Sequence, residues 1–453
     1  MIAIALLVIA LLTLLPSCYR AALLPVIWNL QNTPTPINIV EVGPVHVMPA
    51  DLVVLTLLIQ FGLAMIAGRH LVADRPLYFA IGLFLAVNFL ASVAAGVKFG
   101  SAHFARCLTT EARFISEIGV VPVVAWTVKT LPQARTCIRI LLGTLAMLAA
   151  IQFINFFGAS HGIIIGEVQG MERGEARYFG PVGDSVGFVL LLGYAVSLCS
   201  AQMLGAAAFL GGIVLTAGLG TLLATALCTV LFLVVGTQAE EVRAFVRQRL
   251  WLLPVALLAG VIGVTFFARP MAQTLIDRVS SGNYASSGGQ RMASATLAAE
   301  IITDNPLLGV GYMGYQSSLA HYGGDRYFDL DHHDGATANA NNQYLQALAD
   351  SGIPGLLALG LLLFCAARLL WIVGRTSDDR LVRTFHLAAF IWLLTQVFGN
   401  IAAAWLIPSS CIARFLWVIL GIAVAAARLA PAAARESSGA KKPRWQPLQP
   451  ITT

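Results

Sequence analysis

The sequence predicts an all-α polytopic membrane protein with about 12 transmembrane helices and a helical loop domain between spans 9 and 10. Of 453 residues, 58% are hydrophobic and 11% are charged, whereas soluble domains carry about 25% charged residues. Apolar runs long enough to cross a bilayer recur along most of the chain. A soluble fold this apolar would have no polar surface, whereas lipid-facing residues need no charge.

The apolar runs place the expected spans in order along the chain. They lie near 1–15, 51–68, 77–97, 114–128, 137–157, 184–201, 203–217, 218–236, 251–268, 353–374, 384–406 and 409–427. The seventh and eighth runs are separated only by Gly218, so they form either one bent element or a tight hairpin. No basic residue precedes the first run, and we expect it to remain as a span and not to be cleaved as a signal peptide.

Four regions follow from these runs. We expect nine spans over 1–268, a loop domain over 269–352, three spans over 353–429 and a disordered tail over 430–453. Within the loop, a helix over 291–302 should stop at Asp304-Asn305-Pro306. A second helix over 341–350 should lead through Gly352-Ile353-Pro354-Gly355 into the next span. A connection this long is expected to fold into a small cap over the membrane.

Lysine and arginine predict the orientation of the spans. With twelve spans, the basic segments 69–76, 129–139, 237–250, 368–383 and the tail share one side with both termini. We take that side as cytoplasmic. The net charge of +6 then reflects topology and indicates no nucleic-acid partner. The basic residues left on the other side run against the rule and need a functional reason.

Seven cysteines fall mostly inside or at the ends of apolar runs, without the spacing of metal ligands. We interpret them as small buried residues. If Cys18 and Cys107 both face an oxidising compartment, a disulfide between them is an alternative.

Two arginines on the outer side are candidate anion ligands. Arg177 lies just before a span, where its planar guanidinium can bind a phosphate or a lipid headgroup. Arg291 follows Gly288-Gly289-Gln290 and is expected to open the loop helix, where exposed amides favour anions; the alternative is an ordinary surface arginine. Together with neighbouring arginines they would form a cradle for a diphosphate.

Two further patterns lie in the loop. Gly309-Val310-Gly311-Tyr312-Met313-Gly314 matches a dinucleotide-binding pattern, but no strand precedes it, and a glycine turn between two loop helices fits better. Segment 325–335 is rich in Asp and His, including His332 and His333. Three interpretations of this segment remain open: a solvated loop, a site for a divalent cation, or a loop that supplies a histidine as general base.

Several of these pieces, in this order, resemble the O-antigen ligase and bacterial polysaccharide polymerase family. The similarity covers roughly 170–360 and rests on Arg177 with Gly180-Pro181, Arg291, Asn305-Pro306-Leu307-Leu308-Gly309-Val310-Gly311, Asn342-Gln343-Tyr344-Leu345-Gln346 and Gly352-Ile353-Pro354-Gly355. The resemblance implies a glycosyltransferase that needs no metal or other cofactor. It would move a glycan from an undecaprenyl-diphosphate carrier to a lipid or glycan acceptor on the periplasmic face of the bacterial inner membrane.

The resemblance also implies roles for individual residues. Arg177 and Arg291 would bind the diphosphate and stabilise the leaving group. The implied substrate contacts also include Arg173, Arg326, Asn342 and Tyr344. Asn341 stands where the family commonly has a catalytic histidine, and asparagine takes no proton at neutral pH. Either His332, His333 or His321 then supplies the base, or the arginines alone carry the rate. The Ser-Arg that the family often has after a threonine is also missing at Thr216-Ala217-Gly218-Leu219.

Three functions compete at this point. The first is a polysaccharide polymerase or ligase, with the missing histidine favouring a polymerase or a broader member of the family. The second is a transporter or flippase, which would need ionisable residues within the spans; we expect the spans to hold almost none. The third is a non-catalytic member of an export complex.

Overall fold

The computed structural model describes residues 14–29, 40–42, 45–47, 49–68, 74–169, 177–180, 185–216, 219–236, 287–324, 339–401 and 410–437. The expected span over 251–268 and nearly all of the one over 1–15 lie outside these residues. The described part is helical apart from two short antiparallel hairpins. They pair β1 (Val40–Val42) with β2 (Val45–Val47), and β3 (Glu167–Gln169) with β4 (Arg177–Gly180).

The helices follow one another in an order that matches most of the predicted runs. They are α2 (Ser17–Asn29), α3 (Pro49–Ile66), α4 (Arg75–Phe99), α5 (Ser101–Ile118), α6 (Val120–Thr127), α7 (Leu131–Gly158), α8 (Val186–Cys199), α9 (Met203–Leu215), α10 (Leu219–Leu231), α14 (Ser287–Asp304), α15 (Gly314–Ser318), α17 (Gln343–Thr376), α18 (Arg380–Gly399) and α19 (Cys411–Ser437). Short helical turns follow α7 at Ala159–His161 and α10 at Phe232–Gly236.

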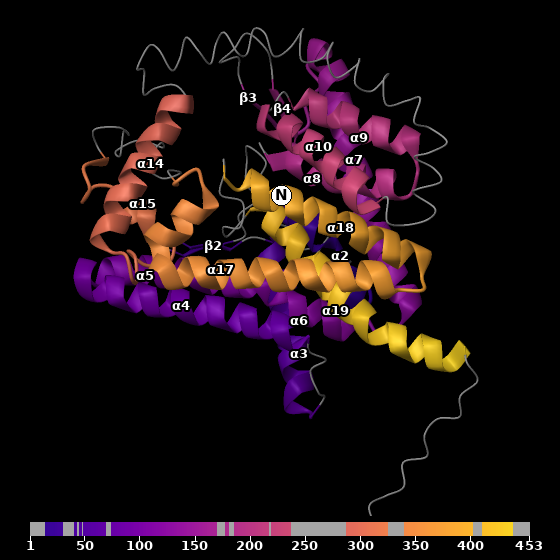
Figure 1. Ribbon diagram of the computed structural model, residues 1–453, viewed down its shortest axis with the longest axis horizontal. Helices are drawn as coiled ribbons and strands as arrows, with labels where there is room; N and C mark the ends of the chain where they lie inside the picture. Colours follow the sequence, from indigo (N-terminus) through magenta and orange to yellow (C-terminus); the bar gives the residue numbers. More distant parts are fainter. Residues whose placement is uncertain are drawn as a thin grey trace, which may run out of the picture.

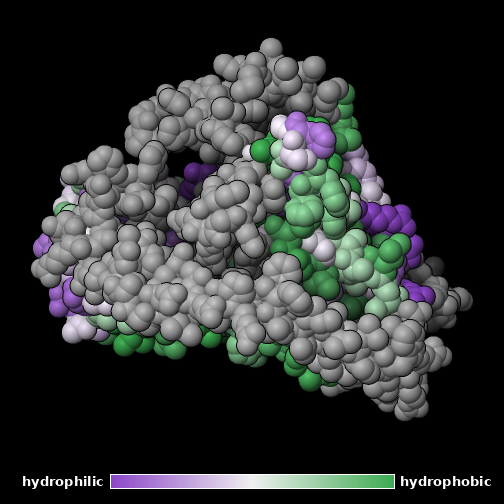
Figure 2. Space-filling view, turned by 90° about the horizontal axis from the view of Figure 1, so that it is seen from above, coloured by the Kyte–Doolittle hydropathy of each residue, from purple (hydrophilic) through white to green (hydrophobic). Residues whose placement is uncertain are grey.

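Five helices in the described part are long and apolar enough to cross a membrane. They begin at Arg75, Leu131, Gln343, Arg380 and Cys411, and α3, α8, α9 and α10 are shorter apolar helices. Large hydrophobic side chains remain exposed on several of them, including Leu204, Leu223 and Phe364. Figure 2 shows hydrophobic residues at the surface, at the right of the view and along its lower edge. Such a surface fits lipid and not water, so the chain is a multi-pass membrane protein.

Polar side chains set the ends of the long helices. Asp74 accepts the amide of Leu77 at 3.1 Å at the start of α4. Thr130 and Gln133 form a capping box at the start of α7. Asp379 accepts the amide of Val382 at 2.9 Å at the start of α18. These caps satisfy amides that the first helical turn leaves free, so the charged loops fix where the spans begin.

The core of the bundle is formed around α8 and α19. Every residue of α8 from Val186 to Leu198 is buried, and α19 is buried from Cys411 to Ala426. Trp392 of α18 donates its indole N–H to the carbonyl oxygen of Phe188 at 2.8 Å. A helix that is apolar all round and buried all round is an interior helix, with little lipid contact of its own.

Helices α4 and α17 lie side by side along the long axis of the molecule (Figure 1). The helices α14 and α15 pack at the N-terminal end of α17, and α15 also contacts α5. A small second core joins them, built from Ala293, Leu297, Ile301, Val310, Tyr315 and Leu319 among others. The described segments 287–324 and 339–352 therefore pack together at one end of the helix pair.

The expected span over 114–128 is wrong. The structure divides this segment at Gly119, between the polar α5 and the short, buried α6. Pro122 has no N–H to donate to the carbonyl of Ile118, which removes one helical hydrogen bond across the junction. Helix α2 was not expected at all, because its 13 residues are too few for a span and include Arg20.

Two further boundaries differ from the prediction. Helix α14 begins at Ser287, so Arg291 lies about one turn inside the helix and does not open it. Helix α19 continues to Ser437, past residue 430 where the tail was expected to begin. The end of α14 at Asp304 agrees with the stop predicted at Asp304-Asn305-Pro306. The runs over 203–217 and 218–236 form two helices, α9 and α10.

Candidate functional site

The glycine turn at 306–311 docks on the kink of α17. Three backbone hydrogen bonds join the two segments: Val310 N to Ala349 O at 2.9 Å, Gly311 N to Asp350 O at 2.8 Å, and Ile353 N to Pro306 O at 3.0 Å. The two glycine-containing segments of the loop are therefore in direct contact, although about forty residues separate them.

Glycine is required at both sides of this contact. Gly309 has φ +62° and Gly352 has φ +65°, a conformation that other residues rarely adopt. A β carbon on Gly309 would overlap the carbonyl oxygens of Ala349 and Asp350, and one on Gly352 would overlap that of Leu307. The pattern read from the sequence as a glycine turn between loop helices is confirmed.

The turn rests on α4 and α5. Tyr312 donates its amide to Ser92 Oγ at 3.1 Å. His103 places Nε2 2.6 Å from the carbonyl oxygen of Val310, and because a carbonyl only accepts, this nitrogen carries the proton. Its Nδ1 lies 3.1 Å from Ser317 Oγ. Sequence reasoning missed His103, whose partners in the loop are over two hundred residues away in the chain.

Lys98 is one of the basic residues left on the outer side by the topology argument. At the end of α4 it donates from Nζ to Asn305 Oδ1 at 2.6 Å. Asn305 in turn donates from Nδ2 to Tyr322 Oη at 2.7 Å. The residue that ends α14 is thereby tied to α4, which gives Lys98 a structural reason for its position.

Residues 340–342, called the elbow below, precede α17. Asn341 has φ +50°, a conformation that asparagine tolerates better than most residues. Asn342 caps α17, because its Oδ1 accepts the amides of Tyr344 at 2.9 Å and Leu345 at 3.1 Å. Tyr344 donates its hydroxyl to the carbonyl oxygen of Val397 at the end of α18. The elbow is thus held by both α17 and α18.

The elbow also reaches the helix that carries Arg291. Asn341 Nδ2 donates to Ser294 Oγ of α14 at 3.2 Å. Ser294 is buried and follows the exposed Arg291 by three residues, so both lie on neighbouring turns of one helix. Asn341, where the resemblance implies a histidine, therefore lies against the helix of Arg291.

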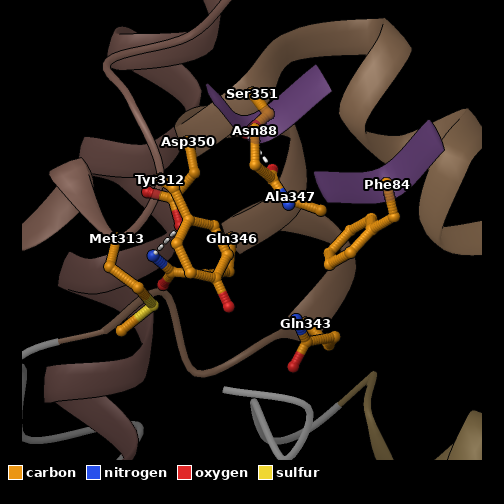
Figure 3. A pocket seen from close by; sticks show the side chains of 9 residues that line it. All are labelled: Phe84, Asn88, Tyr312, Met313, Gln343, Gln346, Ala347, Asp350 and Ser351. Carbon is orange, nitrogen blue, oxygen red and sulfur yellow. Dashed lines mark hydrogen bonds between the residues drawn. The ribbon is translucent and has the colours of Figure 1, made fainter. Parts of the chain in front are cut away.

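A small polar pocket lies behind the elbow (Figure 3). Its polar lining is Asn88, Tyr312, Gln343, Gln346, Asp350 and Ser351. Ser351 Oγ donates to Asn88 Oδ1 at 2.5 Å, and Gln346 Nε2 donates to Asp350 Oδ2 at 2.8 Å. The first of these bonds joins α17 to α4 and the second lies within α17, while the Tyr312 side chain lines the same pocket.

The remaining predicted site residues are placed less fully. Arg177 begins β4, but its side chain lies outside the described residues, as do Arg173, Arg326, His332 and His333. His321 is exposed and packs edge-on against Phe99, with 5.5 Å between the ring centroids. The Asp- and His-rich segment 325–335 is also undescribed. Elsewhere in the described chain, no three His, Cys, Asp or Glu side chains gather as a metal site.

Two ionisable residues near helix ends pair with each other. Glu117 and Arg414 form a buried ion pair, with Oε1 accepting from Nη2 at 3.1 Å and from Nε at 3.2 Å. The Arg414 guanidinium also lies 5.2 Å from the ring centre of Trp28. Because the two charges neutralise each other directly, the pair provides a link between helices and not a free charge for a transport path.

The cysteine alternative is also corrected. All seven cysteines fall in the described chain and are free thiols, so Cys18 and Cys107 are not joined. Six are buried, as expected of small core residues. Cys18 lies instead beside Cys137, and the Sγ of Cys137 donates to the backbone carbonyl oxygen of Cys18 at 3.4 Å.

Comparison with known families places part of the chain. Residues 204–360 match the family model described as O-antigen ligase, which confirms the resemblance given by the motifs of the loop. The match covers α9, α10, α14, α15 and the first half of α17. No curated protein matches the chain.

Proposed function

We propose that this chain, whose residues 204–360 form an O-antigen ligase family domain, transfers a glycan from an undecaprenyl-diphosphate carrier on the periplasmic face of the bacterial inner membrane. It acts as a polymerase when the acceptor is another carrier-linked glycan, and as a ligase when the acceptor is a lipid. The observation that carries this proposal is the contact between the elbow and the helix of Arg291, within a segment that matches the family.

In this mechanism the arginines supply the electrostatic stabilisation. As the glycosidic bond breaks, negative charge develops on the carrier diphosphate. Arg177 and Arg291 bind its oxygens through two parallel N–H donors each, which a lysine cannot reproduce. The exposure of Arg291 supports this role, because its guanidinium is free to meet a lipid-linked substrate.

The transfer also needs a general base to take the proton of the acceptor hydroxyl, and the Asn341 carboxamide cannot accept a proton at neutral pH. We assign the role of general base to His332 or His333, in the segment between α15 and the elbow. Asn341 then acts through its hydrogen bonds: its amide N–H meets Asn339 Oδ1 at 2.7 Å, and its side chain meets Ser294. Arg173, Arg326, Asn342 and Tyr344 complete the proposed substrate site, the last two by shaping the elbow.

Disruption of the gene tests the function and separates its two forms. Surface polysaccharide from the disrupted strain is resolved by gel electrophoresis beside the wild type. A polymerase predicts loss of the ladder of lengths with single repeats still attached to lipid. A ligase predicts polymer that stays on the carrier with nothing attached to lipid, and an unchanged surface polysaccharide would overturn both.

A further inference from the structure

Gln346 bridges the elbow and a buried carboxylate. Its Oε1 accepts the amide of Ala340 at 2.8 Å, and its Nε2 donates to Asp350 Oδ2 at 2.8 Å. Gln346 is 2% exposed and Asp350 is 3% exposed, so water does not compete for these bonds. The orientation of the Gln346 carboxamide is therefore fixed by its two neighbours, since the Ala340 amide donates to its oxygen and Asp350 Oδ2 accepts from its nitrogen.

Asp350 extends the bridge to the glycine turn. Its Oδ1 accepts the amide of Tyr315 at 3.0 Å. The phenol of Tyr315 donates to the carbonyl oxygen of Ser294 at 2.9 Å, and burial raises the pKa of Tyr315, which keeps the phenol protonated as this donor. Ser294 Oγ accepts Asn341 Nδ2, which returns the network to the elbow.

These bonds form a closed circuit. It runs from Ala340 through Gln346 and Asp350 to Tyr315, then through Ser294 to Asn341. The elbow is consequently fixed against α14 from two directions, once through Asn341 itself and once through the side chains behind it. Buried polar networks of this kind specify one arrangement when every member has its partner.

We propose that Gln346 and Asp350 are positioning residues for glycan transfer, which hold the elbow at 340–342 against the helix of Arg291. This inference rests on the proposed function. Neither side chain needs to touch substrate: each acts through the backbone of Ala340 and through Tyr315. A displacement of about 1 Å at a reacting group can cost about a hundredfold in rate, so the circuit is expected to influence kcat more than KM.

The chemistry of the pair offers a test by exchange. In Asp350→Asn alone, the new side-chain NH₂ of residue 350 faces the NH₂ of Gln346, and neither can accept. Turning the Gln346 carboxamide would offer its oxygen to residue 350 but would take it away from the Ala340 amide. Gln346→Glu alone sets two carboxylates against each other. The double variant Gln346→Glu/Asp350→Asn restores every bond: the new carboxylate accepts from Ala340 and from the residue 350 amide, whose oxygen accepts from Tyr315. One buried carboxylate remains, and the side-chain volumes hardly change.

Purified enzyme and lipid-linked glycan are assayed for kcat and KM, with Asp378→Asn, at an exposed aspartate beyond the far end of α17, as the control. Each single variant should lose about tenfold or more in kcat with KM within about threefold, and the double variant should regain most of the loss. Singles with wild-type kcat would overturn the proposal. So would a folded double variant no better than the singles.

Hydrogen exchange separates this inference from the proposed function. Exchange of the Ala340 amide, followed by mass spectrometry of the peptide over 339–346, should be slow in the wild type and the double variant, and fast in both singles. Equal protection in all four proteins would overturn the positioning role. If the wild-type protein transfers no glycan but the four proteins show the expected exchange pattern, the proposed function is overturned. The role of Gln346 and Asp350 in positioning the elbow would still stand.

Discussion

Gly352 lies so close to Leu307 that a β carbon on it would overlap the Leu307 carbonyl oxygen. This approach lets the turn after α14 hydrogen-bond to the kink of α17. Gly352→Ala should therefore lower the melting temperature in detergent and abolish transfer. Gly352 has φ +65° and ψ −164°, a region essentially reserved for glycine, and holding alanine there costs about 1–3 kcal/mol before the overlap is counted. Gly360→Ala, in the same helix with open space around it, is the matched control and should leave both measurements unchanged.

Replacement of the site arginines tests the mechanism directly. Arg291→Ala and Arg177→Ala should each abolish glycan elongation or attachment in cells, at an unchanged level of protein. Lysine at either position should also be poor, because an ammonium cannot make the paired N–H contacts of a guanidinium. Arg139→Ala, at an exposed arginine of α7 on the side assigned to the cytoplasm, should retain full product. Normal product with both site arginines removed would refute the mechanism.

The assignment of the base predicts a loss of rate without a loss of binding. His332→Ala/His333→Ala should lower kcat by about 10²–10⁴-fold, which is the usual contribution of general acid–base catalysis, and should leave KM nearly unchanged. Steady-state kinetics with lipid-linked glycan measure this split. Full activity in the double variant would discard both histidines as bases and leave the rate to the arginines alone.

The buried pair Glu117–Arg414 predicts strong coupling between distant helices. Glu117→Gln or Arg414→Met should each destabilise the protein by about 3–5 kcal/mol, because the remaining charge would be buried without its partner. The double variant should be more stable than either single, since no lone charge is left. Thermal unfolding in detergent measures the three variants against the wild type, and strictly additive losses would contradict the pairing.

Glu111 predicts a dependence of stability on pH. Burial raises the pKa of Glu111 to about 7 from its ordinary value of 4.5, with Ser92 partly offsetting the shift. The folded state then holds a proton that the unfolded state has released, so this group makes stability fall as pH rises from about 4.5 to 7. Glu111→Gln should flatten that decline in melting temperature. Glu300→Gln, at an exposed glutamate of α14, should not.

Local patterns in the sequence predicted the parts of the fold that depend on local chemistry. Asn305-Pro306 ends α14, and Gly352 marks the kink of α17, because proline and glycine restrict or extend the backbone wherever they occur. Pro122 is a local signal for the division of 114–128, but the high hydropathy of the segment favours one continuous span. Helix α2 is stabilised by burial of residues such as Leu24 and Trp28, which its own short sequence does not reveal.

Contacts across the chain were beyond prediction from one sequence. The partners Glu117 and Arg414 are 297 residues apart, and His103 lies 207 residues from Val310. Each was visible only as a single polar residue near an apolar run. The motifs at 305–311 and 341–355 were recognised as a pair, but their backbone hydrogen bonds depend on a turn geometry that no spacing rule supplies.

Helix α17 runs from Gln343 to Thr376 with a kink at Gly352, and backbone hydrogen bonds from the glycine turn clamp that kink. The two halves of α17 are therefore joined through the turn as well as through the chain. If α17 tilts in the bilayer, we expect Asn341 and the segment that carries Arg291 to move with it.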